Sequence, residues 1–306
     1  MAFILIAFYE VVLPILLMVG VGYFAGRRFR PDTASLAKIA VHLLMPALTY
    51  QSILKSELGA GEVGQYVLLM VVNTAVLGVP AWLFIRRWPG LNRPTHSAFI
   101  LVVTMMNTGN YALPVVEFAY GSGALAYGVI GMITFSALVG TFGVFVASSG
   151  TAGVRQGLIS VMTSPLMLSV VAGLLVRAWE IAVPLPIART IRLLSQATIP
   201  IFLIMLGIQL SAVSLRAMQP AKLWVVLTAC GVRLVIGPII LFGLTALFGL
   251  GGLARQVAII QMSMPTAVNV SLLAEEYKSD REFVSASILI STLGSLFTLS
   301  VLLSLV

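Results

Sequence analysis

Two short polar stretches lie within otherwise apolar segments of the chain, and their residue types suit the binding of a small polar ligand. Residues 104–114 combine two Asn, two Thr, Gly109 and Pro114 within eleven positions. Residues 261–269 have Pro265 at their centre. The side chains that can hydrogen-bond a ligand there are Asn107, Thr108, Asn110, Gln261, Ser263, Thr266 and Asn269.

Neither stretch favours a continuous helix. Within a helix, Gly costs about 1 kcal/mol and Pro about 3 kcal/mol relative to Ala, and Asn competes by bonding its own backbone. We therefore predict helix breaks at Pro114 and Pro265. A break exposes N–H groups, which attract anions, and C=O groups, which attract cations. The predicted substrate site contains no charged side chain and is formed by Asn107, Thr108, Gly109, Asn110, Gln261, Pro265, Thr266 and Asn269.

The alternative is that these residues only let helices pack closely and hydrogen-bond to one another, as small and polar residues do in membrane bundles. For one such cluster the two interpretations are balanced. Two clusters in corresponding helices favour the substrate site.

The composition places these stretches in a membrane protein. Hydrophobic residues make up 59% of the 306 residues, charged residues 9%, and the mean hydropathy is +1.07. A soluble protein of this length needs far more charged and polar side chains on its surface. Most of the apolar surface must therefore face lipid. The net charge of +8 comes from scattered Lys and Arg that form no basic stripe, which argues against a nucleic-acid partner. The single Cys230 excludes an internal disulfide.

Ten apolar runs are long enough to cross a bilayer, which takes about 20 helical residues. We expect an all-α membrane protein with ten transmembrane helices at about 3–26, 36–54, 63–85, 97–119, 124–147, 157–178, 190–210, 222–247, 255–275 and 283–305. The polar stretches fall in helices 4 and 9. The first run lacks a basic leader and is followed by Arg27 and Arg28, so it is expected to be a retained span.

Five helices in each half imply an inverted repeat if the chain is a duplication. We expect one repeat over residues 1–150 and the other over residues 151–306. The second helix of each half carries a proline, Pro46 and Pro200, and the fourth carries the polar interruption. Irregularities at matching positions of two halves indicate a transporter site at the repeat interface.

The distribution of Lys and Arg predicts the orientation. The odd-numbered loops hold 12 of these residues and the even-numbered loops hold 5. Because cytoplasmic loops carry the excess of positive charge, both termini are expected outside, or in the periplasm of a bacterial inner membrane.

Four motifs resemble the auxin efflux carrier family, which includes the plant PIN exporters and bacterial malonate permeases. They are Leu44-Met-Pro-Ala-Leu in helix 2, Asn107-Thr-Gly-Asn-Tyr-Ala-Leu-Pro114 in helix 4, Ile199-Pro-Ile-Phe-Leu-Ile-Met-Leu-Gly-Ile-Gln-Leu210 in helix 7 and Met264-Pro-Thr-Ala-Val-Asn-Val-Ser-Leu-Leu-Ala-Glu-Glu-Tyr277 in helix 9. One departure is Met106, where the PIN carriers have a proline.

The resemblance implies the fold of the bile acid sodium symporters. In that fold helices 1, 2, 6 and 7 form a scaffold domain, helices 3–5 and 8–10 form a transport domain, and broken helices 4 and 9 cross at the membrane centre. It implies an elevator-type carrier of a small organic anion, a mono- or dicarboxylate like malonate, malate or auxin, whose carboxylate lies beside Asn107 and Pro265. It leaves H⁺ or Na⁺ coupling and a homodimer open, and implies no cofactor.

Arg233 and His42 are the candidates for a coupling role. Arg233 lies near the middle of helix 8, where an unpaired charge is costly, so it is expected to face a polar partner in the bundle. His42 could carry a coupling proton, as histidines often do, but a lone His near a helix end is more often a passive interfacial residue. The glutamates in the spans, Glu10, Glu117, Glu275 and Glu276, are expected near the membrane surfaces.

An intramembrane enzyme is not expected. Both Asp residues, Asp32 and Asp280, fall in loops, and the sequence has neither a HExxH motif nor a G-x-S-x-G elbow. A passive channel for organic anions remains the alternative to a carrier, because a broken-helix site can also line a pore.

Overall fold

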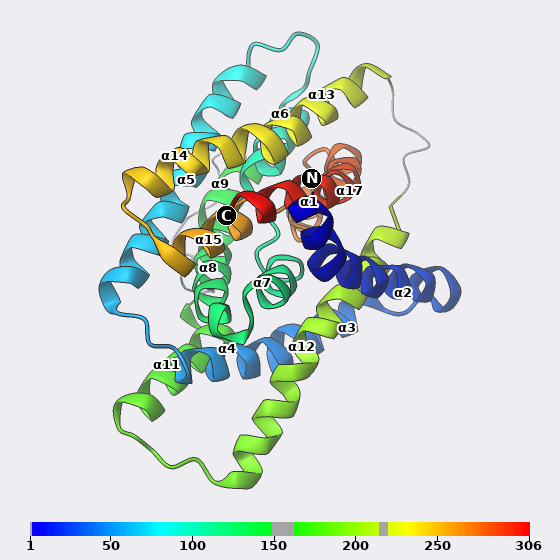
Figure 1. Cartoon of the computed structure of the whole chain (residues 1–306). Coiled ribbons are helices and arrows are strands. Elements are labelled where there is room, and N and C mark those ends of the chain that lie inside the picture. The colour runs from blue at the N-terminus through cyan, green and yellow to red at the C-terminus, as the bar shows by residue number, and fades with distance from the viewer. Residues whose placement is uncertain (1, 149–158, 160–161, 214–219) are drawn as a thin grey trace.

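The computed structural model describes residues 2–148, 159, 162–213 and 220–306, and in this part of the chain the regular structure is helical (Figure 1). Only an isolated antiparallel bridge between Met106 and Thr266 departs from this pattern. The all-α class is confirmed. The predicted boundary between two halves, at residue 150, lies outside the described residues, as do the loop charges Arg155 and Arg216.

The described helices of the first half are α1 (Ala2–Ala7), η1 (Phe8–Val12), α2 (Leu13–Phe29), α3 (Thr33–Ile39), η2 (Ala40–Leu44), α4 (Met45–Leu54), α5 (Ala60–Ile85), α6 (Arg93–Thr104), α7 (Ala112–Tyr120), η3 (Ser122–Ala124), α8 (Leu125–Leu138), η4 (Val139–Gly143) and α9 (Val144–Ala147). Those of the second half are α11 (Pro165–Ala178), α12 (Leu185–Ser211), α13 (Pro220–Gly231), η5 (Val232–Ile236), α14 (Gly237–Leu247), α15 (Gly252–Met262), α16 (Val270–Glu276) and α17 (Arg281–Leu305).

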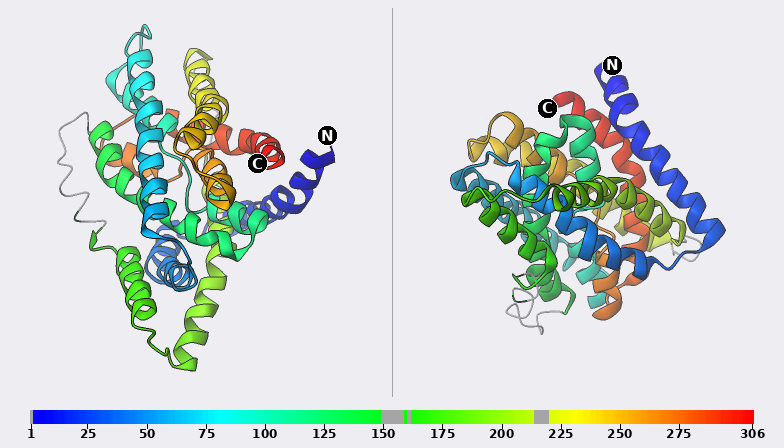
Figure 2. Two further views of the ribbon diagram at one scale, coloured as in Figure 1. Left: turned by 60° about the vertical axis from the view of Figure 1, so that its left-hand side comes forward. Right: turned by 90° about the horizontal axis from the view of Figure 1, so that it is seen from below.

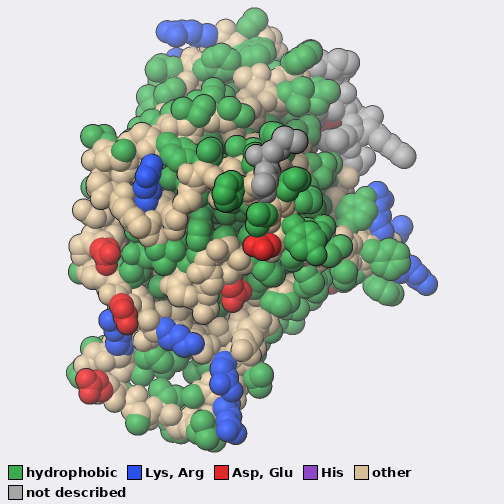
Figure 3. Space-filling model, in the orientation of Figure 1, with side chains coloured by type: hydrophobic (Ala, Val, Ile, Leu, Met, Phe, Trp, Pro, Cys, Tyr) green, Lys and Arg blue, Asp and Glu red, His purple; other side chains and the backbone are tan. Residues whose placement is uncertain are grey.

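Six continuous helical segments are long and apolar enough to cross a membrane. They are Phe3–Phe29, Ala60–Ile85, Ser122–Ala147, Leu185–Ser211, Lys222–Leu247 and Arg281–Leu305. Six of the ten predicted spans coincide with them. Hydrophobic side chains cover much of the surface in Figure 3, as expected for a protein whose outside faces lipid.

Wide π-turns precede three prolines of the chain. The segments η1, η2 and η5 end just before Pro14, Pro46 and Pro238, each of which lies in the first turn of the following α-helix. Proline has no N–H to donate, and its ring clashes with the carbonyl four residues earlier. The wider turn accommodates both constraints, so the helix continues across the proline instead of ending.

The helices pack in two groups. In one, α12 packs along α2 and α4, and α11 packs on α4; in the other, α5 packs on α6 and α8, while α17 packs on α6 and α13 (Figures 1 and 2). The contact of α1 with α17 brings the two termini to the same end of the molecule (Figure 2).

Two glycines allow α2 and α12 to approach closely. A Cβ atom on Gly22 would lie 2.2 Å from the carbonyl oxygen of Ile204, and one on Gly207 would lie 2.1 Å from that of Val19. Small residues at facing positions let membrane helices pack backbone against backbone. The α2–α12 contact therefore depends on the absence of side chains at these positions.

Asp280 ties three helices together at one end of the second group. Its carboxylate accepts hydrogen bonds from Thr95 at the start of α6 (2.7 Å) and from Phe283 N–H of α17 (3.1 Å), and lies 2.9 Å from Lys222 Nζ of α13. Partial burial raises the pKa of Asp280, but the bonds from Lys222, Thr95 and Phe283 outweigh it and leave the pKa below its usual value.

We predict that Gly22→Ala separates α2 from α12 and lowers the thermal stability of the purified protein, at a cost of about 1–3 kcal/mol for an overpacked contact. Gly20→Ala is the matched control on the same helix, because a Cβ atom there meets nothing within 4 Å. The control is expected to leave the melting temperature unchanged or slightly raised. Equal melting temperatures for the two variants would contradict the close approach.

We also predict that Asp280→Asn lowers stability by about 1 kcal/mol at neutral pH, since it removes the charge that binds Lys222. A lowered pKa stabilises the fold above the unfolded-state value, and this contribution is lost as the pH falls through the folded-state pKa. Melting curves of the wild type and the variant should therefore converge below about pH 4. A difference in stability that persists unchanged at a pH well below 4, under the folded-state pKa of Asp280, would rule out the charge as its cause.

Candidate functional site

Two non-helical stretches, residues 105–111 and 263–269, meet inside the molecule, and we call their contact the junction. The first lies between α6 and α7, and the second between α15 and α16. Asn107 N–H donates to the Pro265 carbonyl, and Ala267 N–H donates to the Met105 carbonyl, both at 2.9 Å. These reciprocal bonds flank the Met106–Thr266 bridge, so each stretch satisfies part of the backbone of the other.

The two prolines have different local roles. Pro114 is the third residue of α7, where the missing N–H needs no helical acceptor, so it suits the start of this helix rather than interrupting it. Pro265 lies within the second stretch, and its carbonyl is the acceptor for Asn107. Proline also disfavours helical geometry at the preceding residue, here Met264, which helps to end α15.

A cavity of about 300 Å³ lies beside the junction, between it and helices η2, α8 and α12; we call it the junction cavity. Asn107 Nδ2 and Thr108 Oγ1 line this cavity, are buried, and have no hydrogen-bond partner in the described residues. The backbone N–H groups of four lining residues also donate to no acceptor there: Gly109, Asn110, Val268 and Asn269. No charged side chain is among the described residues that line the cavity.

This arrangement suits an anion. Buried donors without a partner are costly, so a ligand oxygen that accepts from them gains the bonds that the protein leaves unmade. The residues that carry these two side-chain donors and four N–H groups all line one small space. Oriented backbone amides of this kind form anion-binding concavities without a cationic side chain.

Five of the eight predicted substrate-binding residues line the junction cavity: Asn107, Thr108, Gly109, Asn110 and Asn269. Pro265, Thr266 and Gln261 do not line it. Thr266 is fully buried, where its hydroxyl donates to the Val102 carbonyl (3.2 Å) and its N–H donates to Ser291 Oγ (3.2 Å). These contacts hold the second stretch in place.

Gln261 connects three elements behind the cavity. Its Nε2 donates to the carbonyls of Gly128 (2.7 Å) and Thr108 (3.2 Å), and its Oε1 accepts from the Tyr66 hydroxyl (2.8 Å). The side chain fits only because Gly131 has no Cβ, which would lie 2.0 Å from Oε1. In this structure the amide of Gln261 is therefore occupied by the protein.

Arg233 is fully buried in η5 and bonds the carboxyl ends of two helices. Its Nε donates to the Met264 carbonyl (2.8 Å), Nη1 to that of Val103 (3.1 Å), and Nη2 to that of Met262. Val103 lies in the last turn of α6, and Met262 ends α15. The polar partner expected from the sequence is thus a set of three carbonyls, and no carboxylate pairs with Arg233 within the described residues.

The other coupling candidate, His42, is exposed and does not line the junction cavity. Its Nδ1 lies 3.0 Å from the Lys38 carbonyl, one helical turn earlier. Three polar residues that sequence reasoning did not select do line the cavity: Gln209 of α12, Ser136 of α8 and Ser164 at the start of α11. Gln209 is the one amide in the last two turns of an apolar helix, and this isolated position could have marked it as a candidate.

An apolar helical protein with a polar cavity between interrupted helices fits the class of membrane transport proteins. Comparison of sequences confirms this class: the profile of the membrane transport protein family, the auxin efflux carrier family, matches residues 7–157 and 153–303. The chain belongs to this family, and the resemblance noted from its motifs is confirmed.

Its relatives include transporters of similar length. An uncharacterized transporter of Methanothermobacter thermautotrophicus is 28% identical over 95% of both chains. A putative malonate transporter of Rhizobium meliloti is 34% identical over 46% of this chain and 43% of its own length. A probable auxin efflux carrier component of Oryza sativa is 27% identical over 42% of this chain and 23% of its own.

We predict that Arg233→Gln lowers the melting temperature and disrupts the junction, since it leaves at least one of three buried carbonyls unpaired, at a cost of about 1–3 kcal/mol each. Arg233→Lys is expected to retain part of the stability, because the charge remains but the planar fork is lost. Arg189→Gln on the exposed surface of α12 is the control and should melt like the wild type. If the Arg233→Gln protein melts like the wild type, the three hydrogen bonds of Arg233 are not needed for the stability of the junction.

Proposed function

We propose that the protein is a carrier that moves a small organic anion, held by its carboxylate in the junction cavity, across the membrane by alternating access. Its proposed location is the cell membrane, namely a bacterial inner membrane, with both termini outside. In this proposal α6–α7 and α15–α16 are the two broken transmembrane helices of ten, and they cross at the membrane centre.

The observation that carries the proposal is the set of unpartnered donors in the cavity. Asn107 Nδ2 and Thr108 Oγ1 are buried without an acceptor, and four backbone N–H groups beside them are likewise free within the described residues. A small carboxylate offers four lone-pair sites to such donors. The volume of about 300 Å³ suits a small organic acid.

The contacts at the junction support an inverted repeat. Asn107 and Ala267 make equivalent bonds to the opposite stretch: Asn107 N–H donates to the Pro265 carbonyl, and Ala267 N–H donates to the Met105 carbonyl. The two termini lie together at one end, as an even number of crossings requires. Repeats of opposite orientation that meet at mid-membrane are a common design of secondary transporters.

The proposed moving parts follow the two packing groups. Helices α1–α4, α11 and α12 would form the static scaffold, and α5–α9 with α13–α17 would carry the junction. The junction cavity lies between these groups, with Met45 and Phe202 on one side and Asn107 and Met132 on the other. A site at such an interface can be exposed to either membrane side when one group slides past the other.

The relatives support the choice of substrate class. One is named a putative malonate transporter and another a probable auxin efflux carrier component. Malonate and auxin are both carboxylates. The free donors of the cavity would bind the carboxylate group and not the remainder of the molecule. A dicarboxylate or an aromatic monocarboxylate is therefore the first substrate to test.

A passive channel is the second candidate, and one observation favours the carrier. An apolar cluster that includes Leu48, Leu125, Ile199 and Phe202 closes the space beyond the junction cavity. A polar anion cannot cross such a cluster without a change in the contact between helices, because its charge would be desolvated. Saturable uptake with counterflow would identify the carrier, whereas flux that does not saturate would identify the channel.

We predict that Asn107→Ala and Thr108→Val each reduce uptake of [¹⁴C]malonate into proteoliposomes at least tenfold, the loss of a bond of about 1.4 kcal/mol to a charged ligand. Asn73→Ala is the matched control: its amide is also buried and unpartnered, but it lies in α5 and does not line the junction cavity. The control should transport normally. Normal transport by both cavity variants, with malonate, acetate and indole-3-acetate tested, would reject the cavity as the substrate site.

A further inference from the structure

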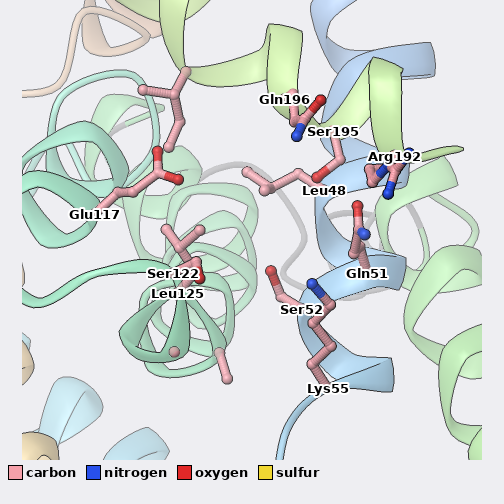
Figure 4. A pocket seen from close by; sticks show the side chains of 13 residues that line it. Leu48, Gln51, Ser52, Lys55, Glu117, Ser122, Leu125, Arg192, Ser195 and Gln196 are labelled. Atoms are coloured by element: carbon pink, nitrogen blue, oxygen red, sulfur yellow. The ribbon is translucent and has the colours of Figure 1, made fainter. Parts of the chain in front are cut away.

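A second cavity, of about 400 Å³, lies between the end of α4 and the first half of α12; we call it the Lys55 cavity. Gln51, Ser52 and Lys55 line it from the α4 side. Arg192, Ser195 and Gln196 line it from α12. Figure 4 shows these side chains on one side of the space, with Glu117 of α7 directed toward it from the opposite side.

The polar side chains that line this cavity have no protein partners among the described residues. Neither Lys55 nor Arg192 forms an ion pair or a hydrogen bond within the described residues, although each brings several N–H donors. The same holds for the side chains of Gln51, Gln196 and Ser195. Charged groups that face a cavity from two helices and remain unpaired are available to a ligand of opposite charge.

The charges favour an anion with one carboxylate near α4 and α12. Two cations face one carboxylate, that of Glu117, which lies across the cavity from them (Figure 4). An oxyanion bound between Lys55 and Arg192 would receive charge-assisted hydrogen bonds from both. When Glu117 is ionised, its carboxylate repels the same anion across the cavity.

The Lys55 cavity and the junction cavity share a wall. Leu48, Leu125 and Ile199 line the Lys55 cavity and belong to the apolar cluster that closes the junction cavity. Other members of this cluster line the junction cavity: Met132, Leu166, Phe202 and Met205. The two cavities therefore lie on opposite sides of one apolar cluster, between the same helices α8 and α12.

We propose that the Lys55 cavity is a second binding site for the transported organic anion, with its carboxylate between Lys55 and Arg192 on the far side of the apolar cluster from the junction. This inference rests on the proposed function. The anion is bound here by cationic side chains and at the junction by neutral donors. Binding at the Lys55 cavity precedes or follows passage of the cluster, and Glu117 weakens it so that the anion is released.

The test uses a single accessible thiol. The native Cys230 is buried, so Gln196→Cys supplies the reactive thiol at the Lys55 cavity. The protein is placed in phosphatidylcholine nanodiscs, which leave both faces accessible. The rate of modification by an anionic methanethiosulfonate reagent is measured against malonate or acetate concentration, and the rate with a cationic reagent is measured alongside.

Malonate or acetate is expected to slow the modification. Lys55→Gln and Arg192→Gln should each raise the half-protecting concentration about tenfold, and Glu117→Gln should lower it. Arg189→Gln, an exposed cation one turn from Arg192 that does not line the cavity, is the control and should change nothing. Asn107→Ala should leave the protection unchanged, which separates a failure of this site from a failure of the junction.

Three results would overturn the proposal. One is the absence of protection by either anion. Another is protection that disappears with Asn107→Ala but persists with Lys55→Gln and Arg192→Gln. The third is slow modification that needs phosphatidylglycerol in the nanodiscs rather than malonate or acetate in solution. This result would assign the two cations to an anionic lipid headgroup.

Discussion

Pairing of the peptide groups at the junction is the constraint on which the rest of the structure depends. Residues 105–111 and 263–269 leave the helical hydrogen-bond pattern inside an apolar protein, where an unpartnered N–H or C=O costs several kcal/mol. The two stretches meet this cost together, through the bonds of Asn107 to Pro265 and of Ala267 to Met105. Neither stretch can hold its shape without the other.

The two ends of the interrupted helices are stabilised differently. The carboxyl ends of α6 and α15 converge on Arg233, whose guanidinium bonds the carbonyls of Val103 and Met262 in these helices and of Met264 just beyond α15. The N–H groups of Gly109, Asn110, Val268 and Asn269 precede α7 and α16, and they have no acceptor within the described residues. These four residues line the junction cavity. A built-in cation thus bonds carbonyls at the negative ends of two helices, while N–H groups just before the positive ends of α7 and α16 are left for a ligand. Through this division of roles, a cavity with no charged side chain among its described lining residues would select the organic anion that we propose as substrate.

Much of this could be predicted from the sequence, because the signals are local. Six spans follow from apolar length, and the polar stretches around Asn107 and Pro265 stand out against their surroundings. The roles of Gln261 and Arg233 could not be assigned, because their partners lie 29 to 195 residues away. Lys55 and Arg192 read as charges that orient the spans, since nothing local shows that α4 and α12 bring them to one cavity.

The most direct test of the account is competition between a labelled carboxylate and its neutral amide for uptake into proteoliposomes. Free N–H donors at the junction cavity favour a negative oxygen, so malonate should inhibit uptake of [¹⁴C]malonate at least tenfold more strongly than malonamide. Equal inhibition by the two compounds would show that the site does not distinguish a carboxylate from a neutral amide, and would contradict the account.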